Sequence, residues 1–293
     1  MKIGVVGVPG GWSSEKLVDA VYQKTGYRLL IDMCRVRFDL AAASCRFEDI
    51  DLLTLDALMV KKIGARYSPD LLDRLEMLRF MSGRGLPVFS PPEKMLRVID
   101  RLSCTVTLRL AGIPMPATTI TESVDAAIEA VCDYGQAVLK PLFSSKARGM
   151  VLVNARPDVR ETIERFRVNN PIMYIQKQID HKGRDLGVVF LGGNYLTTYA
   201  RCANGETWNT TIRSGGGYAA CTPSEDIIRL AHSAQRLFGL DFTCVDVAET
   251  DDGPVVFEVS AFGGFKGIQN ASGLDAAGLY VEYVLNRLKE AGT

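Results

Sequence analysis

The sequence lacks the features that mark secreted, membrane-spanning and cysteine-metal proteins. Its seven cysteines are odd in number, and none of them has a CxxC or Cys/His spacing, which argues against a disulfide framework and a zinc site. No uninterrupted apolar run approaches the roughly 18 residues that a membrane-spanning helix requires. The apolar start at Met1 is too short for a signal peptide. We therefore expect a cytoplasmic protein with reduced thiols.

An excess of either charge is also absent. Thirty-four basic residues balance 34 acidic ones, so we expect neither a nucleic acid nor an anionic membrane as a partner. The sequence has no internal repeat and no low-complexity tract. With 293 residues, 47% of them hydrophobic, the chain is long enough for two or three compact domains.

The two common nucleotide-binding glycine motifs are missing from the N-terminus. Residues 2–8 predict a buried strand, residues 14–23 a helix capped by Ser13 or Ser14, and a second strand begins at Tyr27. This β-α-β start predicts a parallel sheet. The loop between the first strand and the helix matches neither GxGxxG nor GxxxxGK[ST], so we expect it to pack the helix or to contact substrate.

Changes in the pattern divide the chain into three predicted domains. Residues 1–95 form a small open α/β domain, although residues 35–55 fit no clear element. Residues 96–178 begin with one long helix, from Lys94 to Ala111, and continue with alternating strands and helices. Residues 179–293 contain strands, a capping box from Thr222 to Glu225, a loop from Ala261 to Gly267 and a closing helix.

A hairpin near the C-terminus carries the clearest chemical signal. Two β-branched runs between Phe242 and Ser260 flank an Asp251-Asp252-Gly253 turn. Alternation places Val245, Val247, Phe257 and Val259 on a core face, and Asp246, Glu258 and Ser260 on the other face. Opposed carboxylates repel each other unless a cation lies between them, and oxygen donors suit Mg²⁺. The alternative is a pair of solvated carboxylates on an exposed sheet face.

The order of short motifs along the chain resembles the ATP-grasp family, in its α-L-glutamate ligase-like (RimK-type) branch. The resemblance covers residues from about 55 to 285. The motifs are Asp100-Arg101, Gly112-Ile-Pro-Met-Pro, Val138-Leu-Lys140-Pro, Arg148-Gly149-Met150, Tyr174-Ile-Gln176, Gly183-Arg-Asp185, Arg201, Trp208-Asn-Thr-Thr211, Val245-Asp246, Phe257-Glu258-Val-Ser260 and Gly267-Ile268. The resemblance implies an ATP-grasp fold, in which two α+β subdomains hold ATP behind a preceding α/β domain.

The resemblance also implies which residues bind ATP. Lys140 lies in a buried-type strand, where an ammonium requires a nearby anion, and in the family this lysine binds phosphates. Arg101 stands at the place of a second phosphate-binding lysine. The phosphate lid corresponds to Ser144, Ser145, Lys146, Arg148 and Gly149, and the adenine-binding segment to Gln176, Lys177, Gln178 and Ile179. Asp185 matches an acid near the ribose or the lid.

Metal and catalytic residues follow from the same resemblance. Asp246, Glu258 and Ser260 would bind Mg²⁺, with Mn²⁺ as an alternative metal, and Arg201 and Arg213 would neutralise the transferring phosphoryl group. The sequence departs from the family pattern at the lid, which is not glycine-rich, at Lys177, at Gly187, at Ser260 and at Gly263-Gly264. These departures leave the substrate and the level of activity open.

The implied reaction is ATP-dependent ligation of a carboxylate and an amine through an acylphosphate, with release of ADP. Glutamate or a similar amino acid would be added to a small molecule or a peptide. Two alternatives remain: a nucleotide-binding regulatory or assembly protein without ligase activity, and a phosphotransferase on the same fold. His181 and His232 are interpreted as structural or surface residues, and homo-oligomers are frequent in the family.

Overall fold

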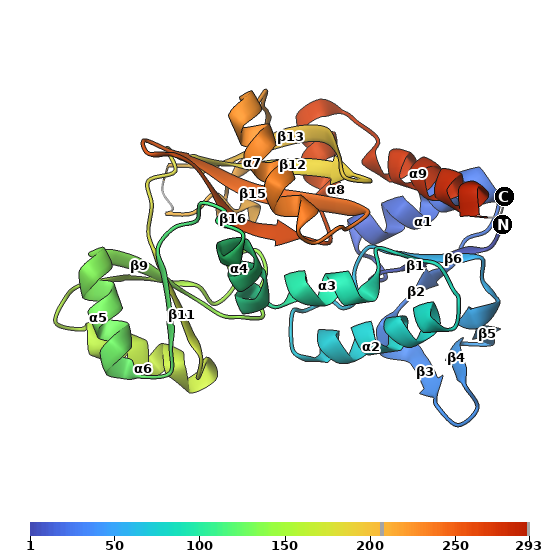
Figure 1. The fold of residues 1–293 in the computed structure, drawn as a ribbon, viewed down its shortest axis with the longest axis horizontal. Helices are drawn as coiled ribbons and strands as arrows, with labels where there is room; N and C mark the ends of the chain where they lie inside the picture. Colours follow the sequence, from blue (N-terminus) through green and yellow to red (C-terminus); the bar gives the residue numbers. More distant parts are fainter. Residues whose placement is uncertain (206–207, 292–293) are drawn as a thin grey trace.

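The computed structural model describes residues 1–205 and 208–291, with every side chain among them except that of Arg213. The chain folds into three lobes that follow one another in sequence, coloured blue to cyan, green to yellow, and orange to red in Figure 1. All seven cysteines are free thiols. Within the described residues, no helix has the length and apolar character needed to span a membrane.

The N-terminal lobe is built on a parallel sheet, as its β-α-β start predicts. The strand order is β2-β1-β6-β7, and each neighbouring pair is parallel. The elements of this layer are β1 (Ile3–Val6), α1 (Trp12–Thr25), β2 (Leu30–Ile31), β6 (Ala57–Val60), α2 (Asp70–Gly83) and β7 (Val88–Phe89). Every residue of β1 and β6 is buried, which explains why both are continuous apolar runs.

Two details of this lobe differ from the sequence prediction. No serine side chain caps α1; instead Ser14 is buried and its hydroxyl accepts a hydrogen bond from the Val8 amide at 3.0 Å. Ser14 therefore fixes the loop before the helix. The segment that matched no element forms a small antiparallel sheet. Its elements are the 3-10 turns η1 (Met33–Arg35) and η2 (Leu52–Thr54) and the strands β3 (Val36–Asp39), β4 (Ser44–Phe47) and β5 (Ile50–Asp51).

The single long helix expected from Lys94 to Ala111 is two helices. α3 (Pro92–Ile99) and α4 (Arg101–Leu110) are separated by Asp100, whose backbone is extended. The Asp100 carboxylate accepts hydrogen bonds from the amides of Leu102 at 3.1 Å and Ser103 at 3.3 Å. Because a helix N-terminus leaves its first amides unpaired, this cap begins a new helix directly before Arg101.

The central lobe is a four-stranded antiparallel sheet with order β10-β9-β11-β8, packed against two helices. Its elements are β8 (Thr118–Thr121), α5 (Val124–Tyr134), β9 (Gln136–Lys140), β10 (Val151–Asn154), α6 (Val159–Asn169) and β11 (Met173–Lys177). Ala137 and Leu139 pack in the core beneath α5 and α6, while Val138 and Lys140 alternate onto the opposite face. That face is free to form a site.

The C-terminal lobe is a five-stranded antiparallel sheet with order β14-β13-β12-β15-β16. Its elements are β12 (Arg184–Leu191), β13 (Asn194–Cys202), η3 (Ile212–Ser214), β14 (Gly217–Ala220), α7 (Glu225–Arg236), β15 (Phe242–Thr250), β16 (Gly253–Ser260), α8 (Phe265–Ser272) and α9 (Ala276–Ala291). Helix α7 is capped by Ser224 rather than Thr222. Helix α8 occupies a segment that was expected to be partly loop, and α9 lies against α1 of the N-terminal lobe (Figure 1).

The hairpin of β15 and β16 has the predicted register at Asp246, which lies opposite Glu258, but the pairs nearer the turn are shifted by one residue. One core residue was predicted wrongly. Between this pair and the next, β16 contains one extra residue, so Val247 pairs with Val256 instead of Phe257. Val256 is therefore fully buried, while Phe257 turns to the same side as Glu258.

The hydrophobic cores join two of the lobes. One core combines residues of α2, α3 and α4 with residues of α7, β15 and β16, and a second combines α1 with α8 and α9. Residues of the central lobe, from Ala127 to Ile175, form a separate core. The central lobe is thus packed as an independent unit against a shared N- and C-terminal body.

Replacement of Asp100 tests the cap that begins α4. We expect Asp100→Ala to lower the free energy of unfolding by about 1 kcal/mol, because two helix amides lose their acceptor. Asp100→Asn, which retains a capping oxygen, should lose much less. Urea unfolding monitored by circular dichroism measures both. Equal losses in the two variants would show that the charge of Asp100, rather than its capping oxygen, stabilises the helix.

Candidate functional site

A cavity of about 660 Å³ lies between the central sheet and the C-terminal hairpin. Most of the residues selected from the sequence line it: Arg101, Lys140, Ser145, Lys146, Arg148, Gln176, Lys177, Gln178, Ile179, Asp185, Arg201, Asp246, Glu258 and Ser260. Ser144 lines an adjoining cavity of about 90 Å³. Gly149 is not among the lining residues of either cavity, and the side chain of Arg213 lies outside the described part of the chain.

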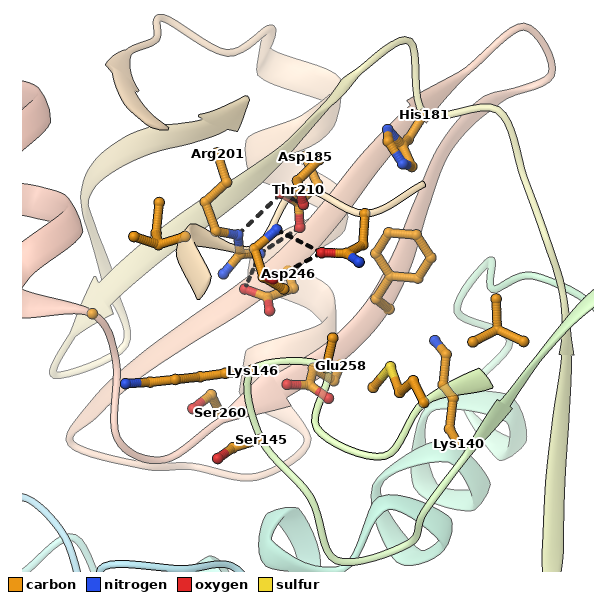
Figure 2. Close-up of a pocket in the computed structure, with 18 of the residues that line it drawn as sticks. Lys140, Ser145, Lys146, His181, Asp185, Arg201, Thr210, Asp246, Glu258 and Ser260 are labelled. Carbon is orange, nitrogen blue, oxygen red and sulfur yellow. Dashed lines mark hydrogen bonds and ion pairs between the residues drawn. The ribbon is translucent and has the colours of Figure 1, made fainter. Parts of the chain in front are cut away.

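Three neighbouring strands place an arginine between two buried carboxylates. Asp185 on β12 lies opposite Arg201 on β13, and Arg201 donates to both Asp185 oxygens, at 3.0 Å and 2.6 Å. Asp185 also accepts a bond from the Thr210 hydroxyl at 2.7 Å. Nη2 of Arg201 then lies 3.0 Å from Asp246 on β15 (Figure 2). Asp185 therefore orients Arg201, and Arg201 holds Asp246.

Asp246 and Glu258 face each other across the hairpin and line the same cavity (Figure 2). Burial raises the pKa of Asp246 to about 7, and the repulsion from Glu258 acts in the same direction, while Arg201 opposes both. The Asp246 side chain is 16% exposed and that of Glu258 41%, so the two carboxylates differ in their access to solvent. A cation in the cavity would stabilise the ionised form of the pair.

Arg101, the first residue of α4, balances the charge of Glu258. Its side chain is 8% exposed, and Nη1 donates to Glu258 at 2.9 Å. The other nitrogens bind the lid segment, Nε at the Pro141 carbonyl (3.1 Å) and Nη2 at the Ser144 hydroxyl (3.3 Å). The guanidinium therefore connects α4, β16 and the segment after β9. Arginine can do this because its planar group carries several N–H donors that point in different directions.

Lys140 projects from β9 toward the cavity with a neutral partner. Its ammonium donates to the Gln176 side-chain oxygen at 2.5 Å, and Gln176 is held in turn by Thr118 and Tyr174. Burial and, to a lesser extent, the nearby Arg101 lower the pKa of Lys140 to about 7, although Glu258 and Asp246 oppose them. An anion bound beside Lys140 would restore its charge, so this end of the cavity fits phosphate.

The lid adopts the backbone of a glycine-rich loop without the glycines. Lys146 (φ 58°) and Ala147 (φ 54°) both have left-handed conformations, which are unfavourable for residues with a side chain. Arg148 and Met150 close tight turns by donating to Ser145 and Ala147. Lys146 and Arg148 line the cavity, so the lid brings two cations to it.

The segment from Gln176 to Ile179 lines another wall of the cavity. The Lys177 amide donates to Ala117 and the Gln178 amide to Gln136, so both are already paired within the protein. Gln176 is buried and uses its side chain to hold Lys140. The segment is therefore a rigid edge, continuous with β11.

Sequence reasoning missed several lining residues. His181, interpreted as structural or surface, lines the cavity; Nε2 lies 3.2 Å from the Trp208 carbonyl, and Nδ1 is buried without a protein partner in the described structure. Phe257 enters the cavity because of the bulge in β16, and its ring lies 5.2 Å from the Lys140 ammonium. A bulge has no residue signature here, so no pattern could have revealed this.

The departure at Gly187 has a steric explanation. Gly187 pairs with Tyr199 on one side and with Asp246 on the other. A Cβ atom added at Gly187 would lie 2.4 Å from Cζ of Tyr199, whose ring occupies the space. Tyr199 thus fills the volume next to Asp246, and glycine is required opposite it.

The donor set fits a hard cation. Asp246, Glu258 and Ser260 supply two carboxylates and one hydroxyl to the same cavity, and oxygen donors of this kind suit Mg²⁺. Throughout residues 1–205 and 208–291, no three His, Cys, Asp or Glu side chains gather in a metal-binding group. A metal here would therefore need the Ser260 oxygen, water or a ligand to complete its coordination.

Comparison with known proteins assigns this arrangement to a family. The model of the RimK-like ATP-grasp domain matches residues 98–284. The chain belongs to the RimK-like ATP-grasp family. The fold and the branch expected from the sequence are thereby confirmed. The expected activity, that of an ATP-dependent ligase that forms carbon–nitrogen bonds, is confirmed as well.

Relatives of known name cover nearly the whole chain. Tetrahydromethanopterin:alpha-L-glutamate ligase from Methanosarcina acetivorans is 26% identical over 98% of this chain and 99% of its own length. Ribosomal protein bS6–L-glutamate ligase from Escherichia fergusonii is 27% identical over 97% of this chain and 95% of its own.

Solved structures show the same ATP-grasp fold. The ATP-grasp ligase PsnB, complexed with a phosphomimetic variant of a minimal precursor, Mg and ADP, has a TM-score of 0.76 at 18% identity, and 98% of each chain is covered. D-cycloserine synthetase DcsG has a TM-score of 0.76 at 15% identity, over 98% of this chain and 100% of that chain.

Substitution of Gly187 tests the packing next to Asp246 in this ATP-grasp protein. We expect Gly187→Ala to lower the free energy of unfolding by about 1–3 kcal/mol, because the new methyl group overlaps the Tyr199 ring. Gly217→Ala, also within a strand of this sheet but with open space at the Cβ position, is the matched control. Thermal unfolding of both variants measures the difference. If both variants melt alike, the steric explanation is wrong.

Proposed function

We propose that the protein uses ATP to join glutamate, or a similar amino acid, through its amine to the carboxylate of a small molecule or a peptide. The observation that carries the proposal is the gathering of Lys140, Arg101, Asp246 and Glu258 around one cavity. The names of the relatives support the amino acid, since they are glutamate ligases of a small molecule and of a ribosomal protein. The division into domains at residues 95 and 178 belongs to the same proposal.

ATP would lie with its phosphates toward Lys140 and the lid. Lys140 has no carboxylate partner among the described residues, and the lid adds Lys146 and Arg148. Adenine would lie against the segment from Gln176 to Ile179. The amides of Lys177 and Gln178 are already paired, which leaves the Ile179 amide as the donor of that segment to the base.

Asp246, Glu258 and Ser260 would hold Mg²⁺, and Mn²⁺ is an alternative with similar oxygen preference. When bound, the metal neutralises charge on the phosphate oxygens of ATP. Asp246 contributes a carboxylate that burial makes easier to protonate, and Arg201 keeps it in place. Glu258 would exchange part of its contact with Arg101 for the metal.

The reaction needs no nucleophile from the protein. A carboxylate oxygen of the acceptor attacks the γ-phosphorus of ATP, and ADP leaves with the electrons of the broken bond. The amine of the amino acid then attacks the acyl carbon of the acylphosphate, losing a proton as phosphate departs. Arg201, and Arg213 if its side chain reaches the cavity, would stabilise the negative charge that develops, as fixed cations do in water-poor sites. Asp185 and Thr210 hold Arg201 in position.

The two carboxylates provide the first test. We expect Asp246→Asn and Glu258→Gln each to lower the rate of ADP release by roughly 100-fold or more. Each variant removes a carboxylate that would hold the metal, and the metal would neutralise the phosphate oxygens of ATP. Glu249→Gln is the matched control, since Glu249 lies on the same hairpin but pairs with Arg184 outside the cavity. Purified protein is assayed with ATP and Mg²⁺ against pools of carboxylates and amino acids.

The outcome separates ligation from nucleotide binding alone. Full ADP release in either carboxylate variant would contradict the metal assignment. Binding of ATP by the unaltered protein with no ADP formed from any pool would favour the regulatory or assembly role. A stable phosphorylated product, in place of an amide, would identify a phosphotransferase.

Proton uptake on nucleotide binding provides a second test. The surrounding protein lowers the pKa of Lys140 from its ordinary value of 10.5 to about 7, so a large share of the Lys140 side chains is neutral at a pH slightly above 7. A bound triphosphate raises that pKa, and a proton must then enter from the buffer. Calorimetry of ATP binding without metal, in buffers that differ in ionisation enthalpy, measures the uptake.

Lys140→Met should bind ATP more weakly and abolish this uptake. Lys182→Met is the control, because Lys182 is exposed and pairs with Asp251 on the surface. Binding heats that are independent of the buffer in the unaltered protein would contradict the assignment of Lys140 to the phosphates.

A further inference from the structure

Lys61 is a buried lysine to which neither the resemblance nor the reaction assigns a role. It follows β6 in the N-terminal lobe, and its residue is only 2% exposed. Burial lowers the pKa of Lys61 to about 7. Placing an ammonium in a protein interior is costly unless its hydrogen atoms are satisfied. Its contacts therefore indicate what the lysine stabilises.

Both side-chain hydrogen bonds of Lys61 go to one segment of the C-terminal lobe, and its ammonium also lies 5.5 Å from the centroid of the Phe242 ring on β15. The Lys61 ammonium donates to the carbonyl oxygens of Phe262 at 2.9 Å and Gly263 at 2.5 Å, and it lies 3.7 Å from the centroid of the Phe265 ring. No carboxylate of the described residues forms an ion pair with it. Two carbonyls and an aromatic face thus satisfy the three donors of the ammonium.

The same segment holds Ser260. The Phe262 amide donates to the Ser260 hydroxyl oxygen at 3.3 Å, and the Thr243 hydroxyl donates to the Ser260 carbonyl at 2.9 Å. The carbonyl of Phe262 is bound by Lys61 from the N-terminal lobe. Two consecutive hydrogen bonds therefore lead from Lys61, through Phe262, to Ser260.

The segment also packs closely against aromatic side chains of the C-terminal sheet. A Cβ atom at Gly263 would lie 2.7 Å from the Phe242 ring, and one at Gly264 would lie 2.7 Å from the Tyr199 hydroxyl oxygen. Phe262, Gly263 and Gly264 also line the cavity. The backbone is thus held between aromatic side chains of the C-terminal sheet and Lys61.

We propose that Lys61 is a positioning residue, which fixes the segment from Ser260 to Gly264 from beneath and so presents the Ser260 hydroxyl to the metal. This inference rests on the proposed function, because that proposal assigns Ser260 to Mg²⁺. It adds a role for the N-terminal lobe, which otherwise contributes no residue to the lining of the main cavity within the described residues. The lobe supports the active site as well as adjoining it.

The chain offers a matched control in Lys94. The Lys94 ammonium also joins the N-terminal part of the chain to a backbone carbonyl of the C-terminal lobe, that of Gly239, at 3.1 Å. That contact is exposed, and neither residue lines the cavity. Lys94→Met therefore removes an inter-lobe lysine contact without disturbing Ser260.

The test measures metal dependence of nucleotide binding. Affinity of a non-hydrolysable ATP analogue is determined by calorimetry over a range of Mg²⁺ concentrations. We expect Lys61→Met to raise by about 10-fold the Mg²⁺ concentration that gives half of the full increase in analogue affinity. Loss of a residue that orients a metal ligand has an effect of this size. Analogue affinity without metal should be unchanged, and Lys94→Met should behave as the unaltered protein in both measurements.

A double-mutant cycle makes the inference specific. In the Ser260→Ala background, Lys61→Met should cause little further change in Mg²⁺ dependence, because the path from Lys61 already ends at a missing hydroxyl. Additive effects, or equal behaviour of Lys61→Met and Lys94→Met, would overturn the inference. If Lys61→Met does not fold, Lys61→Arg replaces it in the test. Arginine keeps the charge and the hydrogen-bond donors but does not match the shape of the site, so the Mg²⁺ dependence should shift by less than 10-fold. An unchanged Mg²⁺ dependence in Lys61→Arg would overturn the inference.

The calorimetric result is independent of ligase activity. If the unaltered protein forms no ADP but the Mg²⁺ dependence responds to Lys61→Met as described, the ligase reaction is wrong and the role of Lys61 stands. If the analogue binds the unaltered protein without any Mg²⁺ dependence, Ser260 holds no metal and the inference is wrong, whatever the activity.

Discussion

The repulsion between Asp246 and Glu258 is the constraint around which the site is arranged. The hairpin places the two carboxylates directly opposite each other, which is unfavourable in a sheet unless positive charge compensates. Each receives its own arginine, Arg201 for Asp246 and Arg101 for Glu258. The arginines come from different elements, Arg201 from β13 and Arg101 from the first residue of α4. The protein itself thus supplies the positive charge that compensates the pair.

These ion pairs also join the lobes. The central lobe has a core of its own, separate from the cores that join the other two lobes, and polar contacts connect it to them. Arg101 binds Glu258 and the lid segment after β9 at once. A change of charge in the cavity therefore acts directly on the contact that orients the lid.

The sequence predicted the opposition of the carboxylates from a ladder centred on Asp252. In the structure the turn is tighter, because Thr250 pairs with Gly253, and the extra residue in β16 brings Asp246 back opposite Glu258. The sequence could not predict this bulge, which exchanges Val256 and Phe257 between core and cavity, since an inserted residue leaves the apolar composition unchanged. The break at Asp100 was missed for a related reason: helical periodicity continues across it, and only the cap reveals two helices. His181 was missed because a single histidine has no pattern, and its place depends on a tertiary contact with Trp208.

The departures from the family pattern have local compensations rather than being simple losses. At Gly187 the volume next to Asp246 is filled by Tyr199. In the lid, Lys146 and Ala147 adopt the left-handed backbone that glycines would otherwise supply. A serine hydroxyl is a weaker metal ligand than an amide oxygen, so the proposed role of Ser260 depends on how its side chain is held. The Phe262 amide donates to that hydroxyl, and the carbonyls of Phe262 and Gly263 are in turn bound by Lys61.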